Sequence, residues 1–251
     1  MQWIHKCDLS WLKERQKHLT ATDIKDLLPF TATGRPRKIT NSDYLKVLAR
    51  KLQTLSEENC ISTGAAARGH LLEPYAISEF NKIGLLRLAF TPGVRENFEL
   101  YHWDDVLICP NNSTLAFSPD ALNDPTDYMK ATILGEVKSY NAEKHLVTSQ
   151  MPKEQLQERW QIATAMAVLP NLEHAWLILF NPSLKDCSLY AIPYSRKDLR
   201  NEIETCFDVA KGWELFLKDD MKRLGYSSTI SEQEIKEELE EIARLNPGNV
   251  L

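Results

Sequence analysis

Two carboxylates and a lysine in the middle of the chain have the spacing of a site that hydrolyses phosphodiesters. Asp120 ends a Ser-Pro-Asp motif that follows an apolar run, and Glu136 and Lys138 flank Val137 in a second run. Side chains alternate between the faces of a strand, so Glu136 and Lys138 should point the same way. If the two runs pair, Asp120 and Glu136 can share one divalent cation, and Lys138 can reach the same phosphate. Mg²⁺ prefers oxygen ligands, and two carboxylates with a backbone carbonyl supply them.

This chemistry suits phosphodiester cleavage, because the reaction needs a nucleophilic water at neutral pH and relief of charge at the leaving oxygen. A bound Mg²⁺ provides both effects. Lys138 can add positive charge beside the developing charge on the phosphate. For the motif alone a simpler alternative is open, in which Glu136 and Lys138 form a surface ion pair worth about 0–1 kcal/mol.

The overall composition limits the class of protein. The chain has 251 residues, of which 43% are hydrophobic and 26% charged, as in ordinary globular proteins. No apolar run approaches the roughly 18 residues of a membrane span, and no signal-peptide pattern is present, so we expect a cytoplasmic protein. The five cysteines are scattered without a CxxC pair, which argues against a disulfide framework, a zinc site or an iron–sulfur cluster.

Charge is distributed unevenly along the chain, although the net charge is −5. Residues 1–53 contain eleven Lys and Arg against five Asp and Glu, a net charge of +6. Residues 226–251 contain two Lys and Arg against six Glu, a net charge of −4. This asymmetry favours a polyanion near the N-terminus, although uneven surface charge without a partner stays open. Arg35, Arg37 and Lys38 are the best candidates for salt-sensitive contacts with a phosphate backbone.

The segments before Asp120 are predicted to be mainly helical. Thr20 and Asp23 form a capping-box pattern for a short helix that should end before Pro29. Asn41 or Ser42 should cap a second helix. A third, from about residue 64, should kink or restart at Pro74.

Strands are predicted around and after Asp120. We expect strands at 105–109, 114–117 and 133–138, a helix over about 153–169, and a buried strand at 174–180. Its partner at 188–192 should end at Pro193. A long helix over 197–217 and a capped acidic helix in the tail should follow.

Taken in order, these features resemble the phage-lambda-type exonuclease (YqaJ) branch of the PD-(D/E)XK nucleases, over roughly residues 11–180. The resemblance is carried by Trp11, Arg15, Leu19, Thr20, Ala21, Thr22, Arg68, Gly69, Glu73, Ala76, Ser118, Pro119, Asp120, Glu136, Val137, Lys138 and Gln161. It implies an α/β fold with a mixed central sheet flanked by helices, a helical N-terminal region and an extra C-terminal helix. We expect the nuclease domain at 1–225 and an acidic extension at 226–251.

The resemblance also implies a role for each residue of the site. The Asp120 and Glu136 carboxylates and the Val137 carbonyl would bind a catalytic metal, and Lys138 would position and activate the attacking water. Glu73 would support the metal site directly or through water.

Four further residues take their roles from the same resemblance. Gln161 would help to hold the active-site arrangement. Arg15 would bind the 5′-terminal phosphate, assisted by Thr22 and by Ser118.

The activity implied is Mg²⁺-dependent 5′→3′ digestion of one strand of linear double-stranded DNA, with Mn²⁺ as a substitute and one or two ions per site. In the family, a ring-shaped trimer threads the DNA and works with a single-strand annealing protein. Such systems belong to phage or prophage recombination in a bacterial host cell. Departures from the family pattern include Ser139 and Tyr140, which replace a common Cys-Pro pair.

Two alternatives stay open from sequence. The first is a restriction or defence endonuclease with the same core, which would cut covalently closed circular DNA that an end-dependent enzyme spares. The second is a non-catalytic DNA-binding protein that keeps the fold.

Overall fold

A mixed five-stranded sheet holds the segment that contains Glu136 and Lys138. The strands are β2 (Tyr101–His102), β5 (Ala121–Leu122), β6 (Ile133–Lys138), β7 (His174–Phe180) and β8 (Leu189–Ser195), in the order β2-β5-β6-β7-β8. β6 and β7 run parallel, and the other neighbours are antiparallel. The computed structural model describes residues 9–28, 38–53, 64–87 and 99–223. The chain divides into two compact units, Met1–Ala210 and Lys211–Leu251.

A second, smaller sheet lies before Asp120 in the chain. It contains β1 (Leu19–Thr20), β3 (Leu107–Ile108) and β4 (Leu115–Phe117), in the order β1-β4-β3. The apolar run before Asp120 is therefore β4, and it does not pair with β6 as the sequence had suggested. Instead the two residues that follow Asp120 form β5, which pairs with β6.

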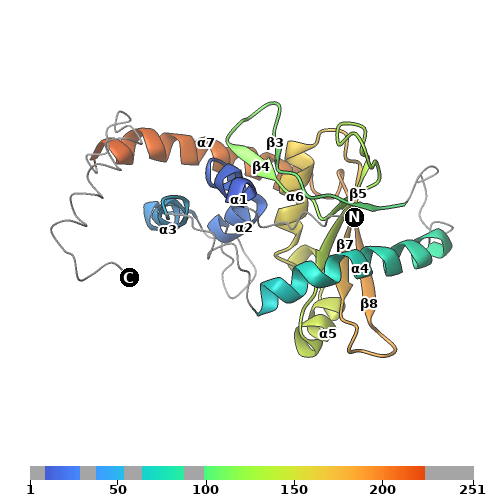
Figure 1. Cartoon of the computed structure of the whole chain (residues 1–251). Coiled ribbons are helices and arrows are strands. Elements are labelled where there is room, and N and C mark those ends of the chain that lie inside the picture. The colour runs from blue at the N-terminus through green and yellow to red at the C-terminus, as the bar shows by residue number, and fades with distance from the viewer. Residues whose placement is uncertain (1–8, 29–37, 54–63, 88–98, 224–251) are drawn as a thin grey trace. The chain divides into compact units, whose positions relative to one another are not determined.

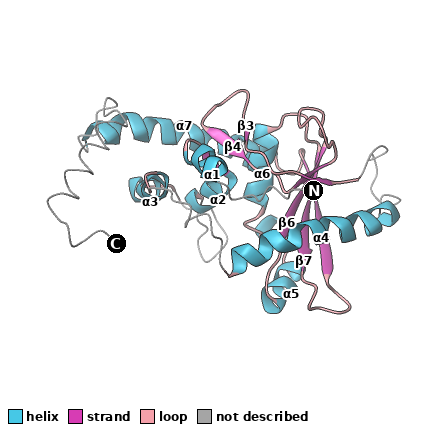
Figure 2. Ribbon diagram, viewed as in Figure 1, coloured by secondary structure: helices cyan, strands magenta, loops and turns pink. Residues whose placement is uncertain are grey.

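The described residues also form helices. They are α1 (Leu9–Gln16), α2 (Ala21–Leu27), α3 (Asn41–Lys51), α4 (Ala65–Arg87), α5 (Ala142–Gln150), a 3₁₀ helix (Lys153–Gln155), α6 (Arg159–Val168) and α7 (Arg200–Arg223). Figure 2 shows helices and strands in separate colours. No helix in the described ranges is both long and apolar enough to cross a membrane.

Capping boxes start two of the N-terminal helices. At α2, Asp23 Oδ2 accepts from Thr20 N at 2.9 Å and from Thr20 Oγ1 at 2.8 Å, as the sequence predicted. At α3 the same arrangement joins Thr40 and Asp43, so the cap precedes the predicted Asn41 by one residue. Both caps satisfy backbone N–H groups that a helix terminus leaves without an internal partner.

α4 packs against one face of the large sheet, where it lies across the strands in Figure 1. Ala76, Ile77 and Phe80 from α4 join Ile133 and Val137 of β6 in a buried cluster. The glycine between those two β6 residues, Gly135, lies on the same face. A Cβ atom there would approach Leu100 Cδ1 to 2.7 Å, so this face of β6 is closely packed. The alternate β6 residues, Glu136 and Lys138 among them, therefore point to the other face.

Two prolines lie inside elements that the sequence predicted they would interrupt. α4 continues through Pro74 as one helix of 23 residues, so it does not restart there, and the predicted alternative, a kink, stays a prediction. β8 continues through Pro193 to Ser195, so the predicted end of that strand is wrong. β8 lies at the edge of the sheet, where a residue without an N–H group can be accommodated.

Candidate active site

Asp120 directly precedes β5 and lies beside Glu136 of β6, the strand that pairs with β5. Ala121 pairs with Gly135, so Asp120, one residue earlier, lies opposite Glu136, one residue later, on an antiparallel ladder. Asp120 Oδ2 accepts a hydrogen bond from Val137 N at 2.8 Å, which holds this carboxylate against β6. Both side chains are buried, with residue exposures of 8% and 3%. The two acidic residues are thus brought to one place on the sheet, as predicted.

The Lys138 ammonium joins these carboxylates from the same face of β6. Its Nζ atom donates to Glu136 Oε1 at 2.5 Å. Burial by itself would lower the pKa of Lys138, but the charges of Glu136, Asp120 and Glu158, with the Glu136 hydrogen bond, outweigh it and hold that pKa above its ordinary value. Lys138 is therefore a cation at neutral pH, suited to orienting a water molecule or a phosphate oxygen.

The charges around Lys138 suit a divalent cation. Three buried acidic side chains, Asp120, Glu136 and Glu158, act on the Lys138 ammonium. Buried charges are costly unless they are compensated. Asp120 and Glu136 with the Val137 carbonyl are the oxygen donors that Mg²⁺ takes together with water and substrate phosphate. The donor set therefore fits the predicted metal.

Glu73 is directed to a different set of side chains. Its Oε1 lies 3.2 Å from His70 Nδ1, and its Oε2 lies 3.5 Å from His102 Nε2. His102 pairs with Ala121 in the sheet, so it shares the face that α4 covers, whereas Asp120 belongs to the other face.

This placement bears on the predicted role of Glu73. Among the described residues, no group of three or more His, Cys, Asp or Glu side chains is arranged to hold a metal ion. The role predicted for Glu73, support of the metal site directly or through water, therefore stays a prediction.

Gln161 lies in the first turn of α6 and is buried, with 8% exposure. Its backbone N donates to Glu158 O at 3.0 Å. Within the described ranges, its buried Oε1 atom accepts no hydrogen bond from the protein. A buried acceptor of this kind costs free energy unless another group satisfies it, so it suits a side chain that contacts water or a ligand.

Sequence analysis missed two residues of this site, Glu158 and Tyr140. Tyr140 Oη donates to Glu158 Oε1 at 2.5 Å. Glu158 is buried and is the N-cap residue of α6. Burial and the charge of Glu158 raise the pKa of the Tyr140 phenol, so it remains a donor. The available signals were spacings, because Tyr140 follows Lys138 by two residues and Glu158 precedes Gln161 by three, as neighbours on one face of a strand or helix do.

The predicted phosphate-binding residues Arg15 and Ser118 are in contact. Arg15 Nη1 donates to Ser118 Oγ at 3.0 Å, across 103 positions of sequence. The Arg15 guanidinium also lies over the Trp11 ring, 4.3 Å from its centroid. The parallel pairing of Leu19 with Leu115 brings this N-terminal region beside β4 and Ser118. Ser118 is two residues from Asp120, so this cationic group lies near the predicted catalytic centre.

The other predicted DNA contacts are less defined. Thr22 lies in α2, two residues after the N-cap Thr20, and is partly exposed. Lys38 is exposed ahead of α3. Arg35 and Arg37, like the tail helix predicted at 226–251, lie outside the described residues. The roles assigned to all of them stay predictions.

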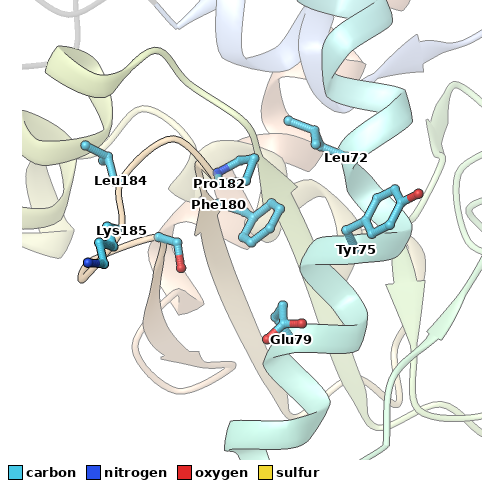
Figure 3. A pocket seen from close by; sticks show the side chains of 8 residues that line it. Leu72, Tyr75, Glu79, Phe180, Pro182, Leu184 and Lys185 are labelled. Carbon is cyan, nitrogen blue, oxygen red and sulfur yellow. The ribbon is translucent and has the colours of Figure 1, made fainter.

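A hollow of about 460 Å³ lies elsewhere, between α4 and the connection of β7 to β8 (Figure 3). Its lining is largely apolar and includes Leu72, Tyr75, Phe180 and Leu184, with the charged Glu79 and Lys185. None of the residues around Lys138 lines it. A mainly apolar lining cannot perform metal-assisted hydrolysis, so we place the candidate active site at the carboxylates and not in this hollow.

Comparison with known proteins identifies the fold. No protein-family model and no curated protein matches the chain. Among solved structures, it is similar to an alkaline exonuclease (LHK-Exo) from Laribacter hongkongensis, with a TM-score of 0.55 and 18% identity over 86% of this chain and 100% of that one. LHK-Exo in complex with dAMP matches with a TM-score of 0.52 and the same identity and coverage. The chain therefore has a mixed α/β fold with a PD-(D/E)XK-like core, the fold of an alkaline exonuclease.

Proposed function

We propose that this protein is a metal-dependent deoxyribonuclease that digests one strand of linear double-stranded DNA in the 5′→3′ direction. The observation that carries the proposal is the grouping of Asp120, Glu136 and Lys138 on one face of the β5–β6 pair. The fold it shares with LHK-Exo, which has been solved with the deoxynucleotide dAMP, supports the same class of substrate.

The residues of the site have separate roles in this proposal. Asp120, Glu136 and the Val137 carbonyl would hold Mg²⁺ or Mn²⁺, which when bound lowers the pKa of a ligated water and stabilises charge on the leaving oxygen. Lys138 would donate hydrogen bonds to that water and to the scissile phosphate, because its raised pKa keeps it protonated. Gln161 would supply its buried carbonyl oxygen to a water or substrate hydrogen bond.

The contact between Arg15 and Ser118 supports the 5′→3′ direction. A guanidinium is always charged and has a planar set of donors that matches phosphate oxygens. It lies in contact with a hydroxyl two residues from Asp120. A 5′-terminal phosphate bound there would bring the first internucleotide linkage toward the carboxylates, so digestion would begin at a phosphorylated 5′ end.

We also propose a setting for this activity, by resemblance. The enzyme would act in phage-type recombination in a bacterial cytoplasm, as a ring-shaped trimer with a single-strand annealing protein as its partner. Sedimentation of the full chain and of a chain truncated after residue 225 would measure the assembly and the contribution of the tail.

A direct test uses linear duplex DNA labelled on either strand. With Mg²⁺, a duplex carrying one 5′-phosphate and one 5′-hydroxyl should lose the phosphorylated strand first, and the 3′-labelled end of that strand should persist longest. Digestion that starts at 3′ ends would contradict the direction. Cleavage of closed circular DNA would favour the endonuclease, and tight DNA binding without cleavage would favour a non-catalytic protein.

A further inference from the structure

The short helix that carries Arg15, α1, has no buried side chain. It spans Leu9–Gln16, and none of its eight residues is buried. Apolar burial therefore contributes less to its position than it does for a core helix. The last carbonyl groups of a helix also have no partner within that helix. The position of Arg15, which binds the 5′-phosphate in the proposed function, thus depends on polar groups of other elements.

Two such contacts come from the C-terminal end of α3. Lys51, the last residue of α3, donates from Nζ to Arg15 O at 3.0 Å, across 36 positions of sequence. Arg15 O also accepts from His18 N, at the longer distance of 3.4 Å. Next to Arg15, Gln16 Nε2 donates to Gln53 O at 2.8 Å. The end of α1 is therefore bound to the end of α3 through the backbone of Arg15.

Asp23 of α2 holds the Lys51 ammonium. Lys51 Nζ lies 2.5 Å from Asp23 Oδ2, and the two side chains are only 12% and 7% exposed. The same Asp23 oxygen accepts from Thr20 in the capping box, and Asp23 Oδ1 lies 3.3 Å from Arg50 Nη2. Burial lowers the pKa of Lys51, and the charge and hydrogen bond of Asp23 oppose this effect, so Asp23 favours the charged ammonium.

The charge of Asp23 is more than a helix cap requires. A neutral Asn could accept the same bonds from Thr20, and a buried ion pair costs free energy to desolvate. The additional effect of the carboxylate is to hold the Lys51 ammonium. Because that ammonium contacts Arg15 O, the pair points to a role in placing Arg15 and not only in starting α2.

Arg15 is consequently fixed at both ends of its side chain. At the tip, Nη1 donates to Ser118 Oγ at 3.0 Å, and the guanidinium lies 4.3 Å from the centroid of the Trp11 ring. At the base, the Lys51 contact holds the backbone carbonyl. Fixing a long side chain costs conformational entropy, and a group that is fixed before binding does not pay that cost when its ligand arrives. Loss of Lys51 would release the base of Arg15 and weaken this preorganisation.

We propose that Lys51, anchored by Asp23, is a positioning residue that holds Arg15 in place and so determines the preference of the enzyme for 5′-phosphorylated ends. The proposal rests on the proposed exonuclease function, in which Arg15 binds the terminal phosphate. Lys51 acts through the backbone of Arg15, and its ammonium, paired with Asp23, does not contact the substrate.

The first test replaces Lys51 by Met in the full-length chain, which removes the ammonium and keeps a long side chain. With Mg²⁺, the ratio of initial rates on linear duplexes with 5′-phosphate and 5′-hydroxyl ends should fall by about 5-fold. The change should lie in a higher KM for phosphorylated ends, with kcat altered by less than about 2-fold. Lys46→Met is the matched control, because Lys46 is an exposed lysine of the same helix, and it should leave the ratio unchanged.

A double-mutant cycle separates positioning from direct contact with phosphate. Arg15→Met should lose most of the preference for 5′-phosphate. Adding Lys51→Met to it should lower the ratio by less than about 1.5-fold, because Lys51 acts only through Arg15. If Lys51 bound the phosphate itself, the second substitution would lower the ratio by the same factor as in the natural protein. That result would overturn the proposal.

A second variant covers the effect of Lys51→Met on folding. That substitution leaves the Asp23 carboxylate buried without its nearest cation, so it should also lower the free energy of unfolding. Asp23→Asn combined with Lys51→Met removes both charges and keeps an acceptor for Thr20, and it should show the same fall in the ratio. Chemical denaturation measures the stability of each variant. An unchanged ratio in either folded variant would contradict the proposal.

The outcomes distinguish this inference from the proposed function. A natural protein that prefers 5′-phosphorylated ends, with a folded Lys51→Met variant that prefers them equally, would overturn only the role of Lys51. A natural protein that digests linear DNA without such a preference would contradict the role of Arg15 in the proposed function, and the inference with it.

Discussion

The Asp120 carboxylate accepts a hydrogen bond from the backbone N of Val137 at 2.8 Å, so one side chain joins the segment after β4 to the strand that presents Glu136 and Lys138. This contact places a predicted metal ligand and fixes its orientation. It uses Oδ2, one of the two oxygens of the carboxylate that we propose holds the cation. Asp120 thus has a structural role, which mutation can separate from the catalytic role that we propose for it.

Replacing Asp120 by Asn should separate these two roles. The amide oxygen of Asn can still accept from Val137 N, so the free energy of unfolding should change by about 1 kcal/mol or less. Loss of the charge should lower the rate of DNA digestion by about 100-fold or more. Asp127→Asn is the matched control, since Asp127 pairs with Lys130 at the surface and should leave digestion unchanged. Retained digestion in Asp120→Asn would exclude Asp120 as a metal ligand.

Arg15→Lys should reduce the preference for a phosphorylated 5′ end. Lysine keeps the positive charge but lacks the planar set of donors with which Arg15 contacts Ser118. We expect the ratio of initial rates on 5′-phosphate and 5′-hydroxyl ends to fall by about 10-fold. Lys13→Gln on the same helix removes an exposed charge and should leave that ratio unchanged. An unchanged ratio in Arg15→Lys would argue against a phosphate contact.

Arg196→Met should destabilise the protein without touching the active site. Arg196 donates to three backbone carbonyls, of Leu172 at 2.7 Å and of Met166 and Leu169 at 2.8 Å. Pro170 has no N–H group with which to satisfy Met166 O, so Arg196 replaces the missing helix bond. Loss of these bonds should lower the free energy of unfolding by about 2–4 kcal/mol in chemical denaturation. The neighbouring exposed Lys197→Met should have almost no effect.

His145 should make the protein less stable in mild acid. The ring is buried in α5, with 1% exposure, and burial lowers its pKa below the ordinary 6.5, although a hydrogen bond with the Cys187 backbone opposes this. A lowered folded-state pKa gives a stabilisation that is present above pH 6.5 and is lost as pH falls through the folded pKa. Its slope is at most about 1.4 kcal/mol per pH unit. His145→Gln should lower this slope between pH 7 and 5, and equal slopes in denaturant titrations would contradict the assignment.

The elements that the sequence predicted well are those determined by local patterns. β6 and β7 have the predicted bounds, 133–138 and 174–180. After His174, β7 is a continuous apolar run, as a buried strand is expected to be. The capping box at the start of α2 could be predicted because Thr20 and Asp23, which contact each other, are only three residues apart in the sequence.

Long-range contacts account for what the sequence did not predict. β5 has only two residues, Ala121 and Leu122, which are too few to show the alternation of a strand in the sequence. Its extended conformation depends on pairing with β6. Pro193 is tolerated because β8 is an edge strand, a position that the order of strands in the chain does not reveal.

The residues of the candidate site likewise include some that local patterns predict and others that depend on long-range contacts. Asp120, Glu136 and Lys138 could be predicted because their types and spacing are typical of the chemistry. Glu158 could not, since its contact with Tyr140 spans 18 positions and joins two different elements. The orientation of Glu73 toward His70 and His102 likewise depends on which face of the sheet α4 covers.

The most direct test of the central claim is digestion of matched linear and covalently closed circular duplex DNA by the purified protein, with Mg²⁺ or with EDTA. We predict that Mg²⁺ supports degradation of the linear form alone, that EDTA stops it, and that Asp120→Asn abolishes it. Cleavage of the closed circle, or digestion of linear DNA that persists in EDTA, would contradict an end-dependent, metal-assisted exonuclease at this site.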